Sequence, residues 1–491
     1  MNYTDGGSKF YLFSIVLVAV LGGLLFGYDT AVISGAEKGL QAFFMQADDF
    51  VYTDTWHGIT SSSALIGCIV GSAFSGFFAT RFGRKYSLFM AGIMFFLSAV
   101  GSYYPEFLFF DYGVPSYSLL VAFNFYRIIG GVGVGLASAI CPMYIAEVAP
   151  SNIRGTLVSW NQFAIIFGQL VVYFVNFLIL GDHVNPVIKA VEGVNQIINP
   201  DEAAWTIDTG WRLMFGSEAV PAGLFSLLVL LVPETPRYLV MVGKDDEALF
   251  VLSRINGMRQ AVAILRDIKS TAEEKTEKLF TYGVTVIFVG IMLSVFQQAV
   301  GINAVLYFAP RIFESMGMGN PMAQTVFMGV VNILFTLLAI FMVERLGRKP
   351  LLIVGSLGMA IGAAGVALSN ALTVPTIIPV VSIMIYSASF MFSWGPICWV
   401  LIAEIFPNTI RGGAVAIAVA FQWIFNFIVS STFLPMYNMS VGDMGVKFGH
   451  MFVYGLYAII CVVAAVFVLK LVPETKGKTL EDMTRLWKKN K

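Results

Sequence analysis

Twelve long apolar stretches constrain this chain more than any other feature of its sequence. An α-helix needs about 20 residues to cross the hydrocarbon core of a bilayer, and each stretch is close to this length or longer. Only 12% of the 491 residues are charged, whereas a soluble domain has about 25%. We therefore predict an all-α polytopic membrane protein with twelve transmembrane helices, over 10–34, 57–80, 86–103, 117–146, 158–180, 212–232, 281–309, 323–343, 350–369, 375–403, 412–435 and 450–471.

The basic residues are unevenly distributed among the predicted loops and tails. Most of the 30 Lys and Arg residues fall in the amino tail, in alternate loops and in the carboxyl tail. Loops rich in Lys and Arg remain in the cytoplasm, so we predict that both termini are cytoplasmic. The apolar run after Lys9 is too long for a signal-peptide core and lacks a small-residue cleavage site. We take it as a retained first helix.

The chain contains an internal duplication. The segment AEVAPSNIRG matches the later segment AEIFPNTIRG at six of ten positions, and RFGRK and VPETPR recur as RLGRK and VPETKG. Each motif follows the corresponding span of its own half, which predicts a parallel repeat of two six-helix units. We predict an N-terminal six-helix half (1–232), a cytoplasmic linker with short amphipathic helices (233–280), and a C-terminal six-helix half with a cytoplasmic tail (281–491). A plain solvated linker is the alternative.

The sequence contains no complete motif for a cofactor or for catalysis. The four cysteines lie singly in apolar stretches and the three histidines are far apart, so neither a disulfide framework nor a metal site is indicated. Residues 477–479 read GKT, but Val472 stands where a phosphate-binding loop needs glycine. The glycines at 130–135 do not fit GxGxxG and lie inside a predicted span. We expect no enzyme activity, no cofactor, no nucleotide and no nucleic-acid partner, so any uphill transport must draw on an ion gradient.

Three charged residues fall inside predicted spans, where each costs about 2.5–3.5 kcal/mol. They are Asp29, Arg127 and Glu218. A carboxylate beside Arg stays ionised, whereas removing the Arg leaves it desolvated and easily protonated. Asp29 and Arg127 therefore form a candidate proton-coupling pair. A static buried ion pair, or an Asp29 hydrated from the outer face, is the alternative.

Uncharged polar residues are concentrated in the predicted spans of the second half. Two from the fifth span, Gln162 and Gln169, are seven residues apart and share one helical face. A helix break near Gly301, with Pro310 beyond, would let the adjacent Gln297 and Gln298 both reach a central cavity. Amides flanked by indole rings suit a neutral polyhydroxylated ligand, although such amides can also serve only to hold helices together. The second-half set is Gln297, Gln298, Asn303, Tyr307, Asn332, Trp399, Gln422 and Trp423.

The motifs of this chain resemble those of the sugar porter family of the major facilitator superfamily. The resemblance covers nearly the whole chain and rests on GGLLFGYDTAVISG, RIIGGVGVGLAS, PMYIAE, NQFAIIFGQL, FQQAVGINAVLYFAP, SWGPICWVLIAEIFP and VPETKGKTLE. It implies the major facilitator fold of two pseudo-symmetric six-helix bundles that alternate access to a central site. It also implies a monomer in the cell inner membrane that imports a monosaccharide, D-xylose in first place, together with a proton.

The resemblance also implies roles for individual residues. Sugar hydroxyls would be bound by Gln162, Gln297, Gln298, Asn303, Asn332 and Gln422, in a pocket walled by Tyr307, Trp399 and Trp423. Asp29 would accept the proton, with Arg127 as its partner and Glu218 as a modulator. A cytoplasmic gate would comprise Arg84, Glu147, Arg154, Arg348, Glu404 and Arg411.

Three features depart from the family pattern. Phe308 stands where relatives commonly have a second tyrosine, and Thr80 stands where the second half has Glu344. The segment 181–211 is long for the family, and the sequence gives no account of it. Open alternatives are a symporter for arabinose, galactose or glucose, an uncoupled sugar facilitator, and a sugar sensor.

Overall fold

The computed structural model describes residues 7–150, 153–191, 194–271, 279–372, 374–441, 444–476 and 487. Within these residues, 12 helical segments are long and apolar enough to cross a membrane, which confirms the predicted fold class. Most predicted ends lie within a few residues of the observed ones. The first span is the main exception, because it continues past residue 34 to Phe44.

The helices follow one another in two similar sets separated by three short helices. The first set comprises α1 (Lys9–Ala31), α2 (Ile33–Phe44), α3 (Asp54–Arg81), α4 (Gly83–Tyr103), α5 (Tyr117–Val148), α6 (Arg154–Leu180), α7 (Trp211–Gly216) and α8 (Ala219–Leu231). The connecting helices are α9 (Pro236–Met241), α10 (Asp245–Asn256) and α11 (Met258–Thr271). The second set comprises α12 (Val284–Ala299), α13 (Ile302–Tyr307), α14 (Ala309–Ser315), α15 (Pro321–Leu346), α16 (Arg348–Ala371), α17 (Ile377–Phe392), α18 (Trp394–Ile405), α19 (Asn408–Tyr437) and α20 (Lys447–Leu471).

Side-chain caps define where several of the long helices begin. The hydroxyls of Ser8, Thr53 and Ser116 accept hydrogen bonds from the first turns of α1, α3 and α5. These bonds satisfy backbone N–H groups that have no partner within the helix. The polar loops therefore end at defined residues, beyond which the apolar helices cross the bilayer.

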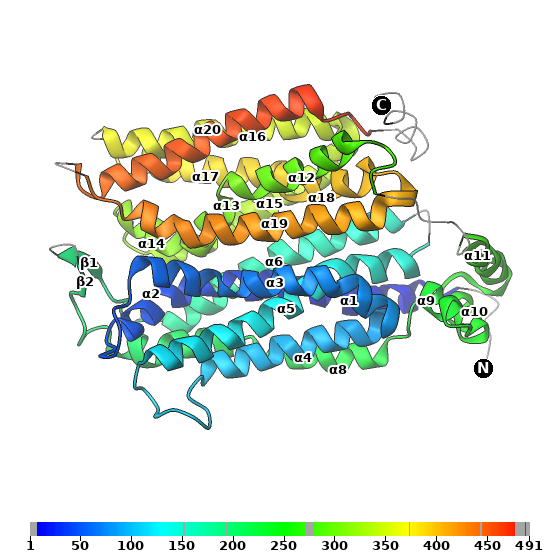
Figure 1. Ribbon diagram of the computed structural model, residues 1–491, viewed down its shortest axis with the longest axis horizontal. Helices are drawn as coiled ribbons and strands as arrows, with labels where there is room; N and C mark the ends of the chain where they lie inside the picture. The colour runs from blue at the N-terminus through cyan, green and yellow to red at the C-terminus, as the bar shows by residue number, and fades with distance from the viewer. Residues whose placement is uncertain are drawn as a thin grey trace.

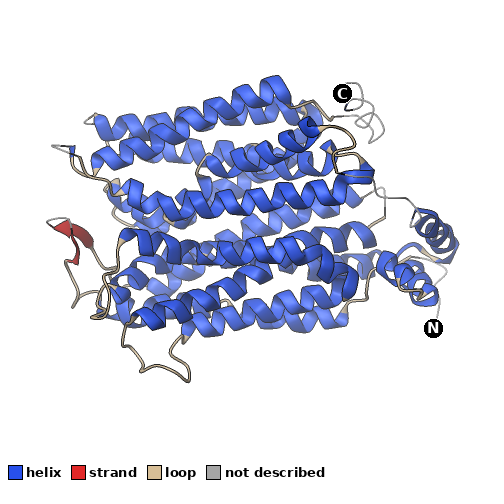
Figure 2. Ribbon diagram, viewed as in Figure 1, coloured by secondary structure: helices blue, strands red, loops and turns tan. Residues whose placement is uncertain are grey.

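The two sets form two bundles that lie side by side (Figure 1). In the first bundle α5 packs on both α3 and α4, and in the second α16 packs on both α17 and α20. The bundles meet where α3 contacts α19 and where α6 contacts α15. We call the end that carries α9–α11 the linker end, and the opposite end, which carries a small β-hairpin, the hairpin end (Figure 2).

The hairpin belongs to the long segment 181–211. Strands β1 (Ile188–Val191) and β2 (Val194–Ile197) pair antiparallel, and a π-helical turn, η1 (Thr206–Gly210), leads into α7. A hydrogen bond from Asn195 Nδ2 to Asp54 Oδ1, 2.7 Å long, ties this hairpin to the start of α3. The segment is thus folded onto the bundle.

Several spans are broken midway into two helices. The break expected near Gly301 is present, because Gly301 has φ +90° in the left-handed region and separates α12 from α13. A side chain at this position would be strained, since left-handed backbone favours glycine. It would also collide with the ring of Tyr457, which lies 2.3 Å from the ideal Cβ position.

We expect Gly301→Ala to destabilise the protein, by about 1–3 kcal/mol from backbone strain alone. The ring collision adds to this loss. The apparent melting temperature of the purified protein in detergent measures the effect. Gly76→Ala, in helix α3 with open space around its Cβ position, is the matched control and should leave the melting temperature nearly unchanged.

Candidate functional site

A cavity of about 710 Å³, including the part open to solvent, lies between the two bundles. Its walls come from α1 and α6 of the first bundle and from α12, α13, α15, α17, α18 and α19 of the second. Eight of the nine residues predicted for substrate binding line it, namely Gln162, Gln297, Gln298, Asn303, Tyr307, Trp399, Gln422 and Trp423.

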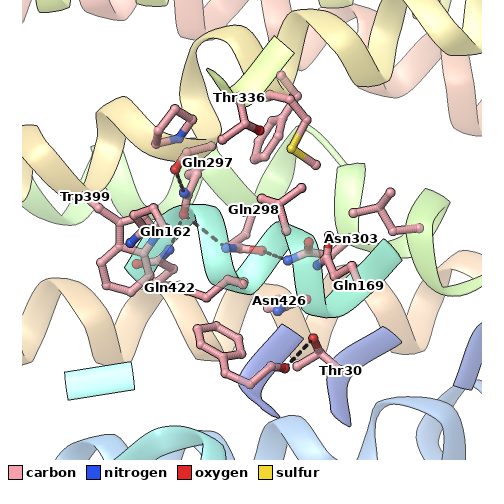
Figure 3. A pocket seen from close by; sticks show the side chains of 18 of the residues that line it. Thr30, Gln162, Gln169, Gln297, Gln298, Asn303, Thr336, Trp399, Gln422 and Asn426 are labelled. Atoms are coloured by element: carbon pink, nitrogen blue, oxygen red, sulfur yellow. Dashed lines mark hydrogen bonds between the residues drawn. The ribbon is translucent and has the colours of Figure 1, made fainter. Parts of the chain in front are cut away.

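The amides along the cavity wall are joined in a chain (Figure 3). Asn303 Nδ2 donates to Gln298 Oε1 at 2.7 Å, and Gln298 Nε2 donates to Gln297 Oε1 at 3.1 Å. Gln297 Oε1 also accepts from Gln422 Nε2, and Gln297 Nε2 donates to Trp394 O at 3.2 Å. The break at Gly301 places Asn303 at the start of α13, so one short stretch contributes three amides to the same wall.

Other polar atoms of the wall have no hydrogen-bond partner among the described residues. They are Gln169 Oε1, Gln422 Oε1 and the indole Nε1 of Trp423, and all three are buried. A buried polar group left unsatisfied costs about 1–3 kcal/mol. The wall therefore offers both acceptors and a donor to a polar ligand.

The cavity wall differs from the predicted substrate-binding residues in one omission and several additions. Asn332 is buried outside the cavity wall, where its Oδ1 accepts a 2.7 Å hydrogen bond from Ser387. Its neighbour one turn along α15, Thr336, faces the cavity instead. Phe26, Thr30 and Asn426 also line the wall. The spacing of Asn426 four residues after Gln422, on one helical face, is the signal that could have found it.

The charged residues of the first bundle lie directly behind this wall. Arg127 donates from Nη1 to Asp29 Oδ1 at 2.7 Å and from Nη2 to the Asp29 carbonyl at 3.2 Å. Both side chains are buried, with 3% and 0% exposure. Thr30, the next residue of α1, faces the cavity while Asp29 faces α5.

Glu218 is the third buried charge and stands at the break between α7 and α8. It lies beside Asp29. Neither carboxylate oxygen of Glu218 has a hydrogen-bond partner among the described residues. The structure thus brings Asp29, Arg127 and Glu218 into one buried group.

A second polar site lies at the linker end, and equivalent residues form it once in each bundle. In the first bundle Arg84 pairs with Glu147 at 2.7 Å, and Thr235 donates to the other oxygen of Glu147 at 2.6 Å. In the second bundle Arg348 pairs with Glu404 at 2.9 Å, and Thr475 donates to Glu404 at 2.6 Å. These four predicted gate residues therefore pair within their own bundles.

The remaining predicted gate residues are Arg154 and Arg411. Arg154 donates to the carbonyl of Ala149 at 3.4 Å. The side chain of Arg411 lies outside the described part of the structure, as do the side chain of Glu344 and residues 477–479.

Each duplicated site also contains a carboxylate that caps a helix. Glu234 accepts from the backbone N–H groups of Arg84 and Lys85 at the start of α4, at 3.1 and 3.0 Å. Glu474 accepts in the same way, at 3.1 and 3.0 Å, from Arg348 and Lys349 at the start of α16. Carboxylates are favoured there because helix N-termini carry positive partial charge.

The pKa values of the two capping carboxylates are shifted in opposite directions. Burial raises the pKa of Glu234 above its usual value, and its backbone hydrogen bonds only reduce this rise. Burial also acts to raise the pKa of Glu474, but hydrogen bonds from the backbone N–H groups of Lys476, Arg348 and Lys349 outweigh it and hold that pKa below its usual value. The fold therefore favours the ionised form of Glu474 and the neutral form of Glu234.

Comparison with known proteins agrees with this geometry. The family model described as "Sugar (and other) transporter" matches residues 15–487. The chain belongs to this sugar transporter family. It is 47% identical to the D-xylose-proton symporter of Escherichia coli strain K12, over 97% of this chain and 96% of that one. It is 37% identical to the glucose facilitated diffusion protein of Zymomonas mobilis, over 97% and 98%.

Among solved structures, this sugar transporter resembles the partially occluded inward open conformation of the xylose transporter XylE from E. coli. The TM-score is 0.83 at 46% identity, covering 96% of this chain and all of that one. Polar contacts also join the two bundles of this chain away from the linker end. Those found among the described residues include Tyr173 to Leu306 in the middle and Asn438 to Asp54 at the hairpin end.

We expect Glu474→Gln to destabilise the protein at pH 7, by about 0.5–1.5 kcal/mol. Since the folded pKa of Glu474 lies below the usual 4.5, its carboxylate contributes stability above pH 4.5. That contribution is lost as pH falls through the folded pKa. Melting temperatures of mutant and parent should therefore converge in acid.

Glu234→Gln is the matched control from the other bundle. Because the fold favours neutral Glu234, replacing it with a neutral amide should cost less at pH 7 than Glu474→Gln. An equal or larger loss for Glu234→Gln would contradict the opposite directions of the two pKa shifts.

Proposed function

We propose that this protein imports a monosaccharide, D-xylose in first place, by proton symport with alternating access. The proposal rests above all on one observation: an amide-lined cavity with partnerless polar atoms lies one residue along α1 from the buried Asp29–Arg127 pair. We further propose that it works as a monomer in the cell inner membrane, with its termini and α9–α11 in the cytoplasm.

The cavity chemistry supports a sugar as the substrate. Sugar hydroxyls donate and accept hydrogen bonds, so they can satisfy the free oxygens of Gln169 and Gln422 and the indole N–H of Trp423. The rings of Trp399, Trp423 and Phe26 provide apolar surfaces for the C–H faces of the sugar. Asn332 would act indirectly, by positioning α15 behind Thr336.

Asp29 would be the proton acceptor. A proton on Asp29 removes its charge, weakens the hydrogen bond from Arg127 and leaves the guanidinium free to take another partner. Glu218, beside Asp29, would modulate this exchange. With one proton per sugar, the membrane potential alone supplies about 2.3 kcal/mol per 100 mV, which corresponds to roughly 50-fold accumulation.

The duplicated ion pairs at the linker end would form the cytoplasmic gate. Arg84–Glu147 and Arg348–Glu404 each form within one bundle. Closing the gate would bring the two sites against each other, with Arg154 and Arg411 supplying further positive charge. The Arg84–Glu147 side chains are 7% and 9% exposed and those of Arg348–Glu404 8% and 32%, so desolvation offsets much of the attraction within each pair.

Another monosaccharide is the main alternative substrate, because the Zymomonas mobilis relative is named for glucose. Uptake of labelled xylose in the presence of arabinose, galactose or glucose would decide between them. An uncoupled facilitator is the second alternative, and the buried Asp29–Arg127 pair argues against it.

We expect Asp29→Asn to abolish accumulation of xylose in proteoliposomes with an imposed proton gradient. The amide cannot exchange a proton, whereas the cavity wall is unchanged, so sugar binding and xylose exchange should persist. Asp48→Asn, at an exposed loop position, is the matched control. Accumulation by Asp29→Asn at the parent level would refute the coupling role.

We expect Gln298→Ala to weaken sugar binding by about tenfold or more, because it removes one amide and leaves Asn303 and Gln297 without a shared partner. Isothermal titration of the purified protein with xylose measures this loss. Gln46→Ala, on the exposed surface beyond α2, should bind as the parent does. Unchanged affinity in Gln298→Ala would count against this wall as the sugar site.

A further inference from the structure

A cluster of charged residues joins the two bundles at the hairpin end, away from the cavity and the linker-end ion pairs; three of its side chains are at most 11% exposed and the fourth, Glu314, is 39% exposed. It comprises Glu37 and Lys38 on α2 together with Arg311 and Glu314 on α14. Glu37 is fully buried and Lys38 is 8% exposed. Glu37 and Lys38 lie in the part of the first span beyond residue 34, which the sequence predicts to lie outside the span because of these charges.

The Glu37–Arg311 contact is the centre of the cluster. Arg311 donates from Nε to Glu37 Oε1 at 3.0 Å and from Nη2 to Glu37 Oε2 at 2.6 Å. The same Nη2 donates to Gln41 Oε1 at 2.5 Å, so one guanidinium holds two residues of α2. Planar bidentate pairs of this kind are among the strongest charge-assisted hydrogen bonds.

Two further contacts hold the cluster in place. Lys38 Nζ forms an ion pair with Glu314 Oε2, next to the first contact. His57 of α3 lies between Glu37 Oε2 at 3.0 Å and the hydroxyl of Tyr52 at 3.1 Å. Glu37 and Lys38 are therefore paired with charged residues of the opposite bundle, while His57 of their own bundle orients Glu37.

Asp54, at the start of α3, makes a separate connection between the same parts. Its Oδ1 accepts from Gln41 at 3.2 Å and from Asn195 of the β-hairpin at 2.7 Å. Its Oδ2 accepts from Asn438, in the second bundle, at 2.8 Å. The hairpin of segment 181–211 is thus tied to the point where the bundles meet.

We propose that Glu37, Lys38, Arg311 and Glu314 form an ionic latch that holds the two bundles together at the hairpin end and must break before a solute can enter the cavity from that side. The latch sets the relative populations of the conformations in which the cavity is open to one side of the membrane or to the other. It concerns the balance between conformations and does not depend on which sugar or ion is carried.

The energetics suit a contact that breaks and re-forms in each cycle. Burying an ion pair costs desolvation that offsets most of its attraction, so the intact pair contributes little net stability. In an open state the same four groups are hydrated by the water that enters. Removing one partner is different, because the closed state then retains an unpaired buried charge.

The test measures distances between spin labels on cysteines introduced at Asp48 and Gly319, by electron–electron double resonance in lipid nanodiscs. Both sites are exposed at the hairpin end, one in each bundle. The four native cysteines are buried and stay in place. The parent should show mainly the short distance of the closed hairpin end.

Charge reversal of one partner should open this end. In Lys38→Glu, two carboxylates face each other, and we expect the ratio of long to short distances to rise about fivefold or more. Arg311→Gln, which leaves Glu37 without its charge partner, should shift the ratio in the same direction. The double variant Lys38→Glu with Glu314→Lys restores opposite charges and should return the ratio toward the parent value.

Lys244→Glu is the control, because Lys244 pairs with Glu247 on the exposed surface of α10, 3.0 Å away. It should leave the distances unchanged. Parent-like distances in both Lys38→Glu and Arg311→Gln, or no recovery in the double variant, would overturn the latch. If Lys38→Glu does not fold, Arg311→Gln and the double variant decide the question. Since the readout is a distance, failure of the latch is distinguishable from failure of sugar binding or proton coupling.

Discussion

The hydrocarbon core of a bilayer offers no hydrogen-bond partner, so each polar group inside this protein must find one in the protein, in a ligand or in water. Most of the chain obeys this constraint by closing its backbone bonds within helices. The charged and amide side chains named above are arranged in groups. An amide chain lines the cavity, a carboxylate–guanidinium group lies behind it, and charge clusters occupy both ends of the bundles.

The groups also differ in whether they stay within a bundle or join the two. At the linker end each arginine–glutamate pair, with its capping carboxylate, is completed within one bundle, and the second bundle repeats the arrangement almost contact for contact. At the hairpin end the charges pair across the interface. The bundles can therefore move as units with most of their internal hydrogen bonds intact, and only the contacts of one end need to change at a time.

Much of this could be predicted from the sequence, because hydropathy and duplication are local or repeated signals. The twelve spans followed from hydropathy and the two halves from the duplication, whereas the family followed from its motifs, the break from Gly301 and most of the amides around the cavity from their clustering. The extension of the first helix to Phe44 did not, because Glu37 and Lys38 look like the end of a span until their partners on α14 are known. Nor did the β-hairpin, whose strands of four residues carry little pattern. Asn332 was assigned to the cavity wall but lies outside it, because a polar residue in a span can bond to a neighbouring hydroxyl, here that of Ser387, instead of to a ligand.

The neighbouring positions 29 and 30 lie on different faces of one helix: Thr30 touches the cavity and Asp29 touches Arg127. On the roles proposed here, what the protein carries and what drives it are specified by separate surfaces that share a rigid backbone. A family built on this plan can change its energy source by substitution at one buried position while the cargo-binding wall is preserved. It can equally change its substrate by substitutions in the wall while the ion pair is kept. Symporters and facilitators for the same sugar can therefore diverge through few substitutions.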